Sequence, residues 1–269
     1  YKPKIKLNKI IISIDENCFL AITKIKNQYI TLKKIKNKKI TFMCSIIGLI
    51  DFKKKYKNKK EIIFNLNKIL KHRGPDDEGY YNNDYVSLGF NRLSIIDLQS
   101  GNQPIINNHV VSIFNGEIFN FKTLKEELKE KGFKFTTKSD SEVLNLAYQA
   151  WGPNFISKCE GMFAIAIYDL KTNKIYLYRD RVGIKPLYFH FNSDLMIFSS
   201  EMKGIINFPD FKKEINYSAI YSYLNFRFPI NNSLNFFKGI FRVKPGFFYE
   251  IDIQNSTFKE NEYWKIPDI

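Results

Sequence analysis

The chain has 269 residues, of which 44% are hydrophobic, and its formal net charge at pH 7 is +15. This length and apolar content suffice for one large packed domain, and Lys residues interrupt every apolar run before it reaches the length of a membrane helix. Three cysteines make no even disulfide framework, and the start shows no signal-peptide pattern. We therefore expect a cytoplasmic protein that does not associate with a membrane.

The positive charge is concentrated at the start of the chain. Residues 1–42 contain 11 Lys and two acidic residues, so that +9 of the net +15 lies in this segment and +6 in the rest. No alternation of basic and aromatic residues marks a groove for a nucleic-acid strand. We expect no nucleic-acid partner, and a basic RNA- or DNA-binding protein is the weakest of the alternatives.

Residues 1–42 differ from the rest in composition and pattern. The segment is rich in Lys, Ile and Asn and lacks sustained helical or strand periodicity. We interpret it as an extension of unknown role, which is a propeptide, an added segment or mistranslated upstream sequence. From Met43 onward the sequence has the pattern of a packed domain.

In the first half of this domain, hydrophobic periodicity predicts four strands and one amphipathic helix. The strands are expected at residues 44–50, 85–90, 92–96 and 110–114, and the helix at residues 61–71. Apparent capping boxes begin at Thr123 and Ser139, each with a Glu three residues later. They predict one helix that stops at Gly132 and a second that runs to about Trp151.

The second half is predicted to contain a hairpin, another strand and two short helices. The hairpin is expected at residues 162–168 and 175–179, the strand at 195–199, and the helices at 201–206 and 218–224. Strand clusters alternate with helix pairs, without the regular strand–helix repeat that a parallel sheet requires. The pattern therefore favours an α+β fold with stacked sheets.

Cys44 stands directly behind Met43, at the head of a predicted strand. If Met43 is removed, Cys44 carries a thiol and a free α-amine on the same carbon. The α-amine has a reference pKa of about 7.7–8.0, close to working pH, so that it can take the proton of the thiol. Cys44 is therefore a candidate nucleophile with a built-in base.

Four further residues match the needs of an amide substrate that carries an amino-acid head group. Asn115 and Gly116 follow an apolar strand and offer a side-chain and a backbone N–H for an oxyanion. Arg92, at the start of another apolar segment, can bind a carboxylate with two hydrogen bonds, and Asp140, at a helix start, can pair with an ammonium. Surface ion pairs, a helix cap and a turn are the plainer roles for these residues.

The three histidines give no comparable signal. His72, His109 and His190 are scattered without metal-ligand spacing, so we expect no metal site and a structural role for each. A dyad of Cys44 with His109 stays open as an alternative. We expect Cys159 to be structural.

Several short motifs occur in one order along the chain. They are MCSIIG at residues 43–48, HRGPD at 72–76, RLSIIDL at 92–98, NGEIFN at 115–120, SDSE at 139–142, GMFA at 161–164, RDRVGIKPLY at 179–188 and SEMK at 200–203. With this set the chain resembles, from residue 43 to about 265, the N-terminal glutaminase domain of glutamine-dependent asparagine synthetases. These are class II amidotransferases of the N-terminal-nucleophile (Ntn) hydrolase type.

The resemblance implies a four-layer αββα sandwich that hydrolyses glutamine to glutamate and ammonia through a thioester on Cys44. It also implies a role for each of the other candidates. By this resemblance the α-carboxylate of glutamine would be bound by Arg92, the oxyanion by Asn115 and Gly116, the α-ammonium by Asp140, and the pocket would be lined by Ile95 and Glu117.

Two features depart from the family pattern. Residues 1–42 leave Cys44 without a free amine unless they are removed. The sequence also lacks the phosphate loop of an ATP-using synthetase, so the resemblance implies a glutaminase domain at residues 43–265 and the start of a linker at 266–269. A synthetase domain in cis or in trans would then hold ATP and Mg, with no cofactor in this chain, and a homodimer is one candidate assembly.

Two alternatives stay open. The same half-reaction serves other class II amidotransferases, which pass the ammonia to a different acceptor. A non-catalytic glutaminase-like module, in which the amine of Cys44 stays blocked, would instead bind glutamine or a protein.

Overall fold

The computed structural model describes residues 12–15, 18–21, 43–93, 102–226 and 235–266 of the chain. The chain divides into two compact units, Tyr1–Thr41 and Phe42–Ile269. In the first unit, strands β1 (Ile12–Asp15) and β2 (Cys18–Ala21) pair in an antiparallel hairpin that the sequence pattern does not predict. In the described part of the chain no helix has both the length and the apolar character needed to span a bilayer.

The second unit is built on two six-stranded antiparallel sheets. In spatial order, the first sheet consists of β12 (Phe241–Arg242), β10 (Tyr188–Phe191), β11 (Leu195–Ser199), β3 (Ser45–Asp51), β5 (Val86–Arg92) and β4 (Asp77–Asn82). The second consists of β14 (Thr257–Glu262), β13 (Phe247–Asp252), β9 (Lys174–Arg179), β8 (Gly161–Asp169), β7 (Val110–Ile118) and β6 (Ile105–Asn107).

The two sheets stack face to face because their strands alternate apolar side chains between two buried faces. In β3, Ile46 and Ile50 belong to the core between the sheets, whereas Ile47 and Leu49 belong to the core under the helices. Strand β7 contributes Ile113 to the core between the sheets. Phe114 of β7 belongs to the core under the helices, so both β3 and β7 are buried on both faces.

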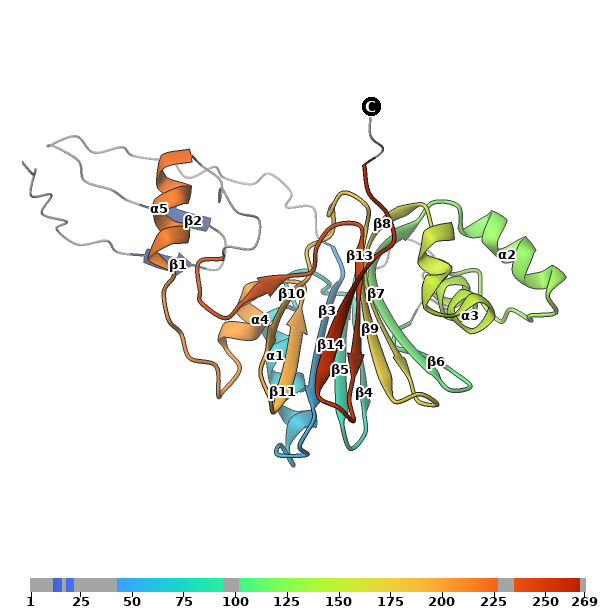
Figure 1. Cartoon of the computed structure of the whole chain (residues 1–269), viewed down its shortest axis with the longest axis horizontal. Coiled ribbons are helices and arrows are strands. Elements are labelled where there is room, and N and C mark those ends of the chain that lie inside the picture. Colours follow the sequence, from blue (N-terminus) through green and yellow to red (C-terminus); the bar gives the residue numbers. More distant parts are fainter. Residues whose placement is uncertain (1–11, 16–17, 22–42, 94–101, 227–234, 267–269) are drawn as a thin grey trace, which may run out of the picture. The chain divides into compact units, whose positions relative to one another are not determined.

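Helices cover the outer face of each sheet, which gives four layers in the order αββα (Figure 1). Helices α1 (Lys59–Ile69) and α4 (Met202–Ile206) pack on the first sheet. Helices α2 (Phe121–Glu130) and α3 (Asp140–Trp151), followed by a 3₁₀ helix (Gly152–Lys158), pack on the second. Helix α5 (Tyr217–Phe226) follows α4 in the chain. The expected α+β class and four-layer sandwich are confirmed.

Most predicted elements are present, but two strand ends differ from the prediction. The segments 85–90 and 92–96 are predicted as two strands, yet β5 is one strand that continues to Arg92, and residues 94–96 lie outside the described residues. The prediction ends another strand at Phe114, whereas β7 continues to Ile118 because it stays paired with β8. Asn115 and Gly116 are thus inside a strand and not after one.

The two predicted capping boxes are wrong in different ways. Helix α2 begins at Phe121, so Thr123 lies inside its first turn and caps nothing. Ser139 does cap α3, and its Oγ accepts a hydrogen bond from the backbone N–H of Ser141 at 3.0 Å. Glu142 does not complete the box, because its carboxylate accepts the backbone N–H groups of two preceding loop residues, 136 and 137, at 2.8 and 2.7 Å.

A buried carboxylate holds the loop that follows β9. The Asp180 side chain is fully buried and accepts backbone N–H groups from Ile184 at 2.8 Å, Lys185 at 2.9 Å and Phe163 at 3.2 Å. Its neighbour Arg179 donates to the carbonyl oxygens of residues 183, 185 and 243. The pair fixes the backbone of residues 181–187 against both sheets.

Replacing Asp180 by Ala should lower the unfolding free energy by about 3 kcal/mol or more, because three backbone N–H groups, two of them in buried hydrogen bonds, lose their acceptor. Urea unfolding of the full chain, followed by tryptophan fluorescence, measures this. The matched control is Asp84→Ala, because Asp84 is exposed and, among the described residues, paired only with Lys54; this variant should leave the midpoint unchanged. Equal midpoints for the two variants would contradict the role assigned to Asp180.

Candidate active site

Cys44 lies directly before the first residue of β3, where the end of this strand meets the core. Ser45 of β3 pairs with Asn91 of β5, so that Cys44 lies beside the end of β5. The backbone N–H of Leu93 points at Cys44 Sγ from 3.3 Å. Burial raises the pKa of the Cys44 thiol, although this N–H and the positive charge of Arg92 act in the opposite direction. The thiol is therefore a weak nucleophile until a base takes its proton.

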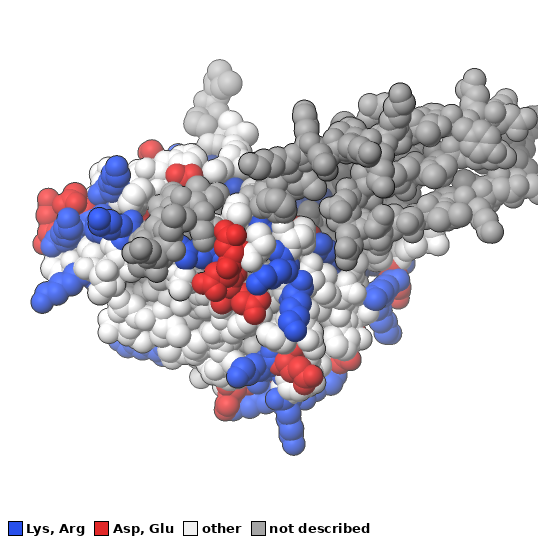
Figure 2. Space-filling view, turned by 180° about the vertical axis from the view of Figure 1, so that it is seen from behind, with Lys and Arg blue, Asp and Glu red and all other residues white. Residues whose placement is uncertain are grey.

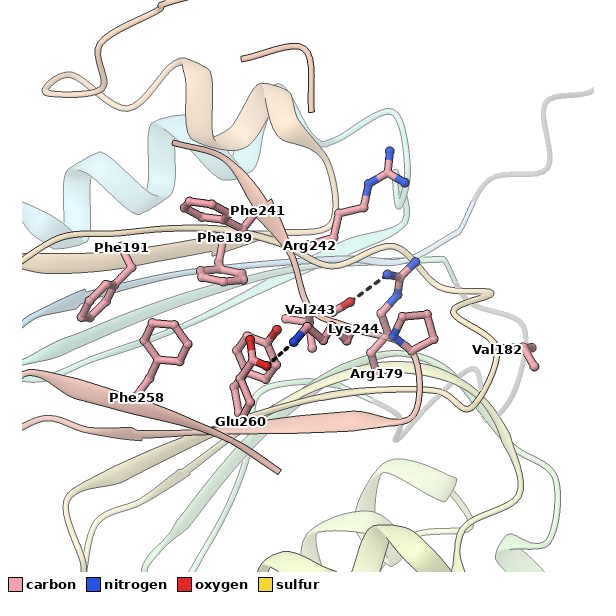
Figure 3. Close-up of a pocket in the computed structure, with 12 residues that line it drawn as sticks. Arg179, Val182, Phe189, Phe191, Phe241, Arg242, Val243, Lys244, Phe258 and Glu260 are labelled. Carbon is pink, nitrogen blue, oxygen red and sulfur yellow. Dashed lines mark hydrogen bonds and ion pairs between the residues drawn. The ribbon is translucent and has the colours of Figure 1, made fainter. Parts of the chain in front are cut away.

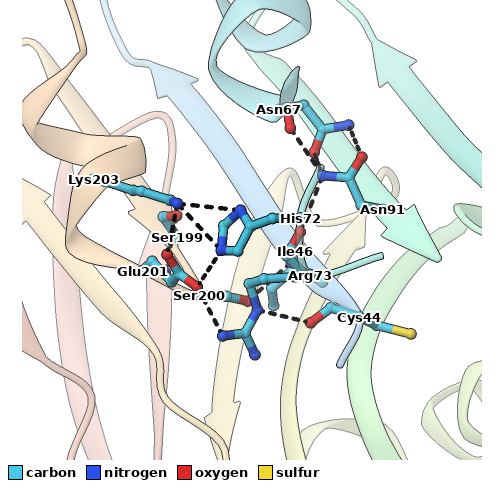
Figure 4. Close-up of polar contacts among 11 residues, drawn as sticks. Cys44, Ile46, Asn67, His72, Arg73, Asn91, Ser199, Ser200, Glu201 and Lys203 are labelled. Atoms are coloured by element: carbon cyan, nitrogen blue, oxygen red, sulfur yellow. Dashed lines mark hydrogen bonds and ion pairs between the residues drawn. The ribbon is translucent and has the colours of Figure 1, made fainter. Parts of the chain in front are cut away.

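Two segments far apart in the sequence hold the backbone around Cys44 (Figure 4). Arg73 Nε donates to the carbonyl oxygen of Cys44 at 3.2 Å, and Arg73 Nη1 is paired with Glu201 Oε1 at 3.0 Å. Ser200 Oγ accepts the N–H of Ile46 at 2.9 Å. Sequence reasoning assigned no role to these residues, although they belong to the motifs HRGPD and SEMK. Together they fix the peptide groups on which the nucleophile depends.

Arg92 is the last residue of β5, not the first of another strand, and it is buried. Its Nη1 donates to Asn102 Oδ1 at 2.6 Å. The next residue, Gln103, bonds both backbone groups of Phe114 on β7, at 2.6 and 3.2 Å, and also Ser141 Oγ on α3 at 3.3 Å. Residues 102 and 103 thus connect Arg92 in the first sheet to β7 in the second sheet and to α3, which packs on that sheet.

Asn115 and Gly116 combine an unused donor with a backbone that only glycine permits. Asn115 is buried, and its Nδ2 has no hydrogen-bond partner among the described residues. A buried amide donor left unpaired costs about 1–3 kcal/mol. Gly116 has φ 153°, and a Cβ there would lie 2.0 Å from the carbonyl oxygen of Met162. A ligand oxygen that accepts from Asn115 Nδ2 would remove that cost.

Asp140, the first residue of α3, is a buried acid without a cationic partner within ion-pair distance in the described part of the chain. Its Oδ2 accepts the N–H of Ile118 at 3.2 Å. Burial, with a smaller contribution from the charge of Glu117, raises the pKa of Asp140 from 3.8 to about 6, although hydrogen bonds from three backbone N–H groups oppose the rise. The site therefore favours a ligand that brings a positive charge to this carboxylate.

The predicted site residues form two groups on facing sheets. Cys44 and Arg92 belong to the first sheet, and the second group (Asn115, Gly116, Glu117 and Asp140) is on β7 and α3. Lys185 connects the groups, because its ammonium interacts electrostatically with both Cys44 and Glu117. Ile95 lies outside the described residues.

The histidines do not join this site. His72 contacts Glu201 Oε1 at 3.0 Å, and His190 Nδ1 contacts the carbonyl oxygen of Gly239 at 2.8 Å. His109 lies in the turn before β7, at the opposite end of that strand from Asn115, so no contact supports a dyad with Cys44. No group of three His, Cys, Asp or Glu that could hold a metal ion occurs among the described residues.

A separate cavity of about 920 Å³ lies between the sheets at the edge formed by β10, β12, β13 and β14 (Figure 3). Aromatic side chains line its interior: Phe189, Phe191, Phe241, Tyr249 and Phe258. The ammonium of Lys244 is paired with Glu260 beside them. None of the predicted site residues lines this cavity, so it is distinct from the surroundings of Cys44.

Charge on the surface is mixed. Figure 2 shows Lys and Arg side chains interspersed with Asp and Glu over the described part of one face. Ion pairs among the described residues include Lys54 with Asp84 at 3.0 Å and Lys158 with Glu127 at 2.8 Å. This face has no continuous basic stripe of the kind that follows a nucleic-acid backbone.

Replacing Asp140 by Asn should stabilise the domain at neutral pH. The folded protein keeps the proton of Asp140 to a higher pH than the unfolded chain does, so the unfolding free energy falls as pH rises from about 4 to about 6. The difference between 3.8 and about 6 corresponds to at most about 3 kcal/mol. Urea unfolding of Asp140→Asn and the parent should therefore differ at pH 7.5 and agree near pH 3.5.

The matched control is Glu142→Gln in the same helical turn, because the pKa of Glu142 is shifted in the opposite direction from that of Asp140. Burial raises the pKa of Glu142, but hydrogen bonds from Thr136 and Thr137 outweigh burial and hold this pKa below its ordinary value. Glu142→Gln should therefore destabilise the domain at pH 7.5, and the loss should vanish as the pH falls below the pKa of the carboxylate. Two variants that change stability in the same direction at pH 7.5 would contradict this account.

Comparison with known proteins identifies the same region of the chain. A family profile described as glutamine amidotransferase domain matches residues 43–264. The glutamine-hydrolyzing asparagine synthetase 2 of Bacillus subtilis is 36% identical over 237 residues, which cover 84% of this chain and 31% of that protein. Asparagine synthetase B of Escherichia coli, also glutamine-hydrolyzing, is 38% identical over 168 residues, which cover 61% and 30%. The chain spans about a third of the length of these relatives.

The similarity to solved structures concerns the fold. The glutamine phosphoribosylpyrophosphate amidotransferase from B. subtilis has a TM-score of 0.57 and 18% sequence identity, and the match covers 82% of this chain and 49% of that chain. A regulatory enzyme of purine biosynthesis gives a TM-score of 0.58 at the same identity. The two stacked sheets with outer helices are thus an architecture that the chain shares with these two enzymes.

Proposed function

The chain belongs to the glutamine amidotransferase domain family, and we propose that residues 43–265 hydrolyse glutamine to glutamate and ammonia through a γ-glutamyl thioester on Cys44. The unpaired buried amide of Asn115 is the observation that carries this proposal. It is a donor without a protein acceptor, next to a glycine whose backbone no other residue could adopt. An oxyanion formed at the substrate amide would supply the missing acceptor.

The reaction needs residue 44 as the amino terminus. The free α-amine takes the thiol proton, Sγ bonds to the δ-carbon of glutamine, and the C–N bond of the tetrahedral intermediate breaks as the protonated amine gives its proton to the departing ammonia. Water then attacks the thioester carbon, which releases glutamate and restores the thiol. While Met43 is attached, the nitrogen of Cys44 is an amide and cannot serve as this base. We therefore propose that residues 1–42 form an extension that is removed together with Met43.

The remaining residues would hold the substrate. Arg92 would bind the α-carboxylate and Asp140 the α-ammonium, while Asn115 Nδ2 and the Gly116 N–H would bind the oxyanion. Loss of one such donor typically costs about 2.7–4 kcal/mol in the activation barrier. Glu117 and Ile95 are proposed to line the pocket.

The ammonia acceptor is a further part of the proposal. Because the curated relatives are named as glutamine-hydrolyzing asparagine synthetases, we propose that a synthetase domain, in cis or in trans, uses ATP and Mg to activate aspartate and consumes the ammonia. No residue of this chain is assigned to either cofactor. We place the reaction in the cytoplasm, and a homodimer is one candidate assembly. Another ammonia acceptor is less favoured, because these relatives are all named as asparagine synthetases. A non-catalytic module is less favoured, because the site retains the hydrogen-bond donors proposed for the oxyanion.

Replacing Cys44 by Ala should abolish glutamine hydrolysis, because no other group can form the thioester. The protein to test is the full chain with a protease site directly before residue 44, which is cut after purification. Release of glutamate and ammonia is the measurement. Cys159→Ala is the control: Cys159 is buried in the core between the second sheet and its helices, its Sγ contacts the carbonyl oxygen of Phe155 at 3.8 Å, and its loss should leave kcat within about twofold. Turnover by Cys44→Ala would contradict the mechanism.

Cleavage before residue 44 should itself switch activity on. The uncut chain lacks the general base, so its kcat should be lower by about 100-fold or more. Glutaminase assays before and after cutting the same preparation, with intact mass to confirm the terminus, test this. Equal rates before and after the cut would show that the α-amine is not the base. Inactivity of the cut protein under all conditions would instead favour the non-catalytic module.

A further inference from the structure

Lys185 brings a buried ammonium to the amino-terminal side of Cys44. Only 6% of the residue is exposed, and its position is fixed because Asp180 accepts its N–H and Arg179 donates to its carbonyl oxygen. Its Nζ lies 3.0 Å from Met43 Sδ. In the described part of the chain no carboxylate lies within ion-pair distance of this ammonium. Lys185 is therefore a buried cation whose contact is the residue directly before the nucleophile.

This contact is a poor one for a buried charge. A thioether sulfur is a weak hydrogen-bond acceptor, so Met43 compensates little for the water that Lys185 has lost. Burial accordingly lowers the pKa of Lys185, and the nearby charge of Arg73 lowers it further. A buried lysine held at a defined place without a counter-ion is costly, which points to a use other than stability.

Removal of Met43 changes what Lys185 faces. The thioether leaves, and the backbone nitrogen of Cys44, next to the place that Met43 occupied, becomes a free α-amine. A protonated amine and an ammonium in one buried space repel each other, and the group that can lose its proton more readily is the α-amine, whose reference pKa is about 7.7–8.0. The repulsion therefore favours the neutral, basic form of the amine.

We propose that Lys185 keeps the α-amine of Cys44 unprotonated at neutral pH, so that the amine can accept the thiol proton. This inference rests on the proposed glutaminase function. Lys185 is a positioning residue in this scheme, because it acts through the amine and forms no bond with glutamine. Lacking this cation, the amine would be largely protonated at pH 7 and would leave the thiol without a base.

The other charged groups near the nitrogen of Cys44 are held by other contacts, so Lys185 is the cation that can act on the α-amine. They are Arg73 and Arg92, which are positive, and Glu117, Asp180 and Glu201, which are negative. The Asp180 carboxylate already accepts three backbone N–H groups, and Glu201 is paired with Arg73 and His72. Arg73 is held between Cys44 and Glu201, and Arg92 is held by Asn102. Lys185 is the cation released by the loss of Met43.

The test compares Lys185→Met, which removes the charge at similar length, with Lys185→Arg, which keeps it. Both are made in the full chain with the protease site before residue 44 and are cut after purification. The acid limb of kcat/KM against pH should move up by about one pH unit in Lys185→Met, so that the rate falls about tenfold at pH 7 and little at pH 9. Lys185→Arg should keep the parent profile. KM for glutamine at pH 9 should be unchanged in both variants.

Three results would overturn the proposal. These are an unshifted acid limb in Lys185→Met, a Lys185→Arg protein that behaves like Lys185→Met, and a loss of rate that is equal at every pH. The last would indicate a purely structural role. Urea unfolding checks that both variants are folded, and Lys185→Gln replaces Lys185→Met if the latter does not fold.

A direct titration separates this inference from the function on which it rests. The pKa of the α-amine is measured by ¹⁵N NMR in cut protein labelled at residue 44, with and without Lys185→Met, and needs no turnover. A pKa about one unit lower with Lys185 present supports the inference, and equal values refute it. If the amine titrates as expected but glutamine is not hydrolysed, the proposed function fails and the role of Lys185 stands.

Discussion

The burial of β3 and β7 on both faces is the constraint on which the rest of the structure depends. A strand packed between another sheet and a helix layer has no face on which a polar side chain can meet water, so its middle must be apolar. Ile46, Ile50 and Ile113 fill the core between the sheets in this way. Apart from Ser112 of β7, whose hydroxyl accepts a hydrogen bond from Asn145, the polar side chains of these two strands lie toward the strand ends. Cys44 precedes β3, and Asn115 lies near the end of β7, because these are positions at which the packing can accommodate polar side chains.

Polar groups at those ends are held by contacts between segments distant in the sequence. The loop of residues 181–187 is tied down by Asp180, the start of β3 by Arg73 and Ser200, and the end of β5 by residues that also bind β7. In such surroundings a donor without an acceptor, or an acid without a cation, is conspicuous. Asn115 Nδ2 and the carboxyl of Asp140 are two such groups, which the proposed function assigns to the oxyanion and the α-ammonium of glutamine.

Much of the fold follows from local pattern, and its failures have physical causes. Strand β11 and the β8–β9 hairpin are predicted well, because each is a short apolar run bounded by turn residues. The dipeptide Asn115–Gly116 reads locally as a turn, yet pairing with β8 carries the strand through it. Glu142 has the spacing of the acidic residue of a capping box, but its carboxylate accepts hydrogen bonds from loop N–H groups, which no local sequence pattern reveals. Strand β14 is an exposed edge strand with mostly polar side chains and leaves little periodic signal. The motifs locate the candidate site residues, but the contacts of Arg73, Gln103 and Lys185 join distant segments and can be seen only in the folded chain.

If residues 43–265 bind glutamine as proposed, the unpaired amide of Asn115 and the buried acid of Asp140 would also tie the folded population of this domain to that ligand. Each is a cost carried by the empty domain, and a bound amino acid that supplies an acceptor and a positive charge removes both. Ligand that binds only the folded state adds about 2.7 kcal/mol when its concentration is 100 times the dissociation constant. A cell rich in glutamine would then hold more of this chain folded and out of reach of proteases than a starved one. The abundance of this domain would then follow the supply of its ligand through folding alone.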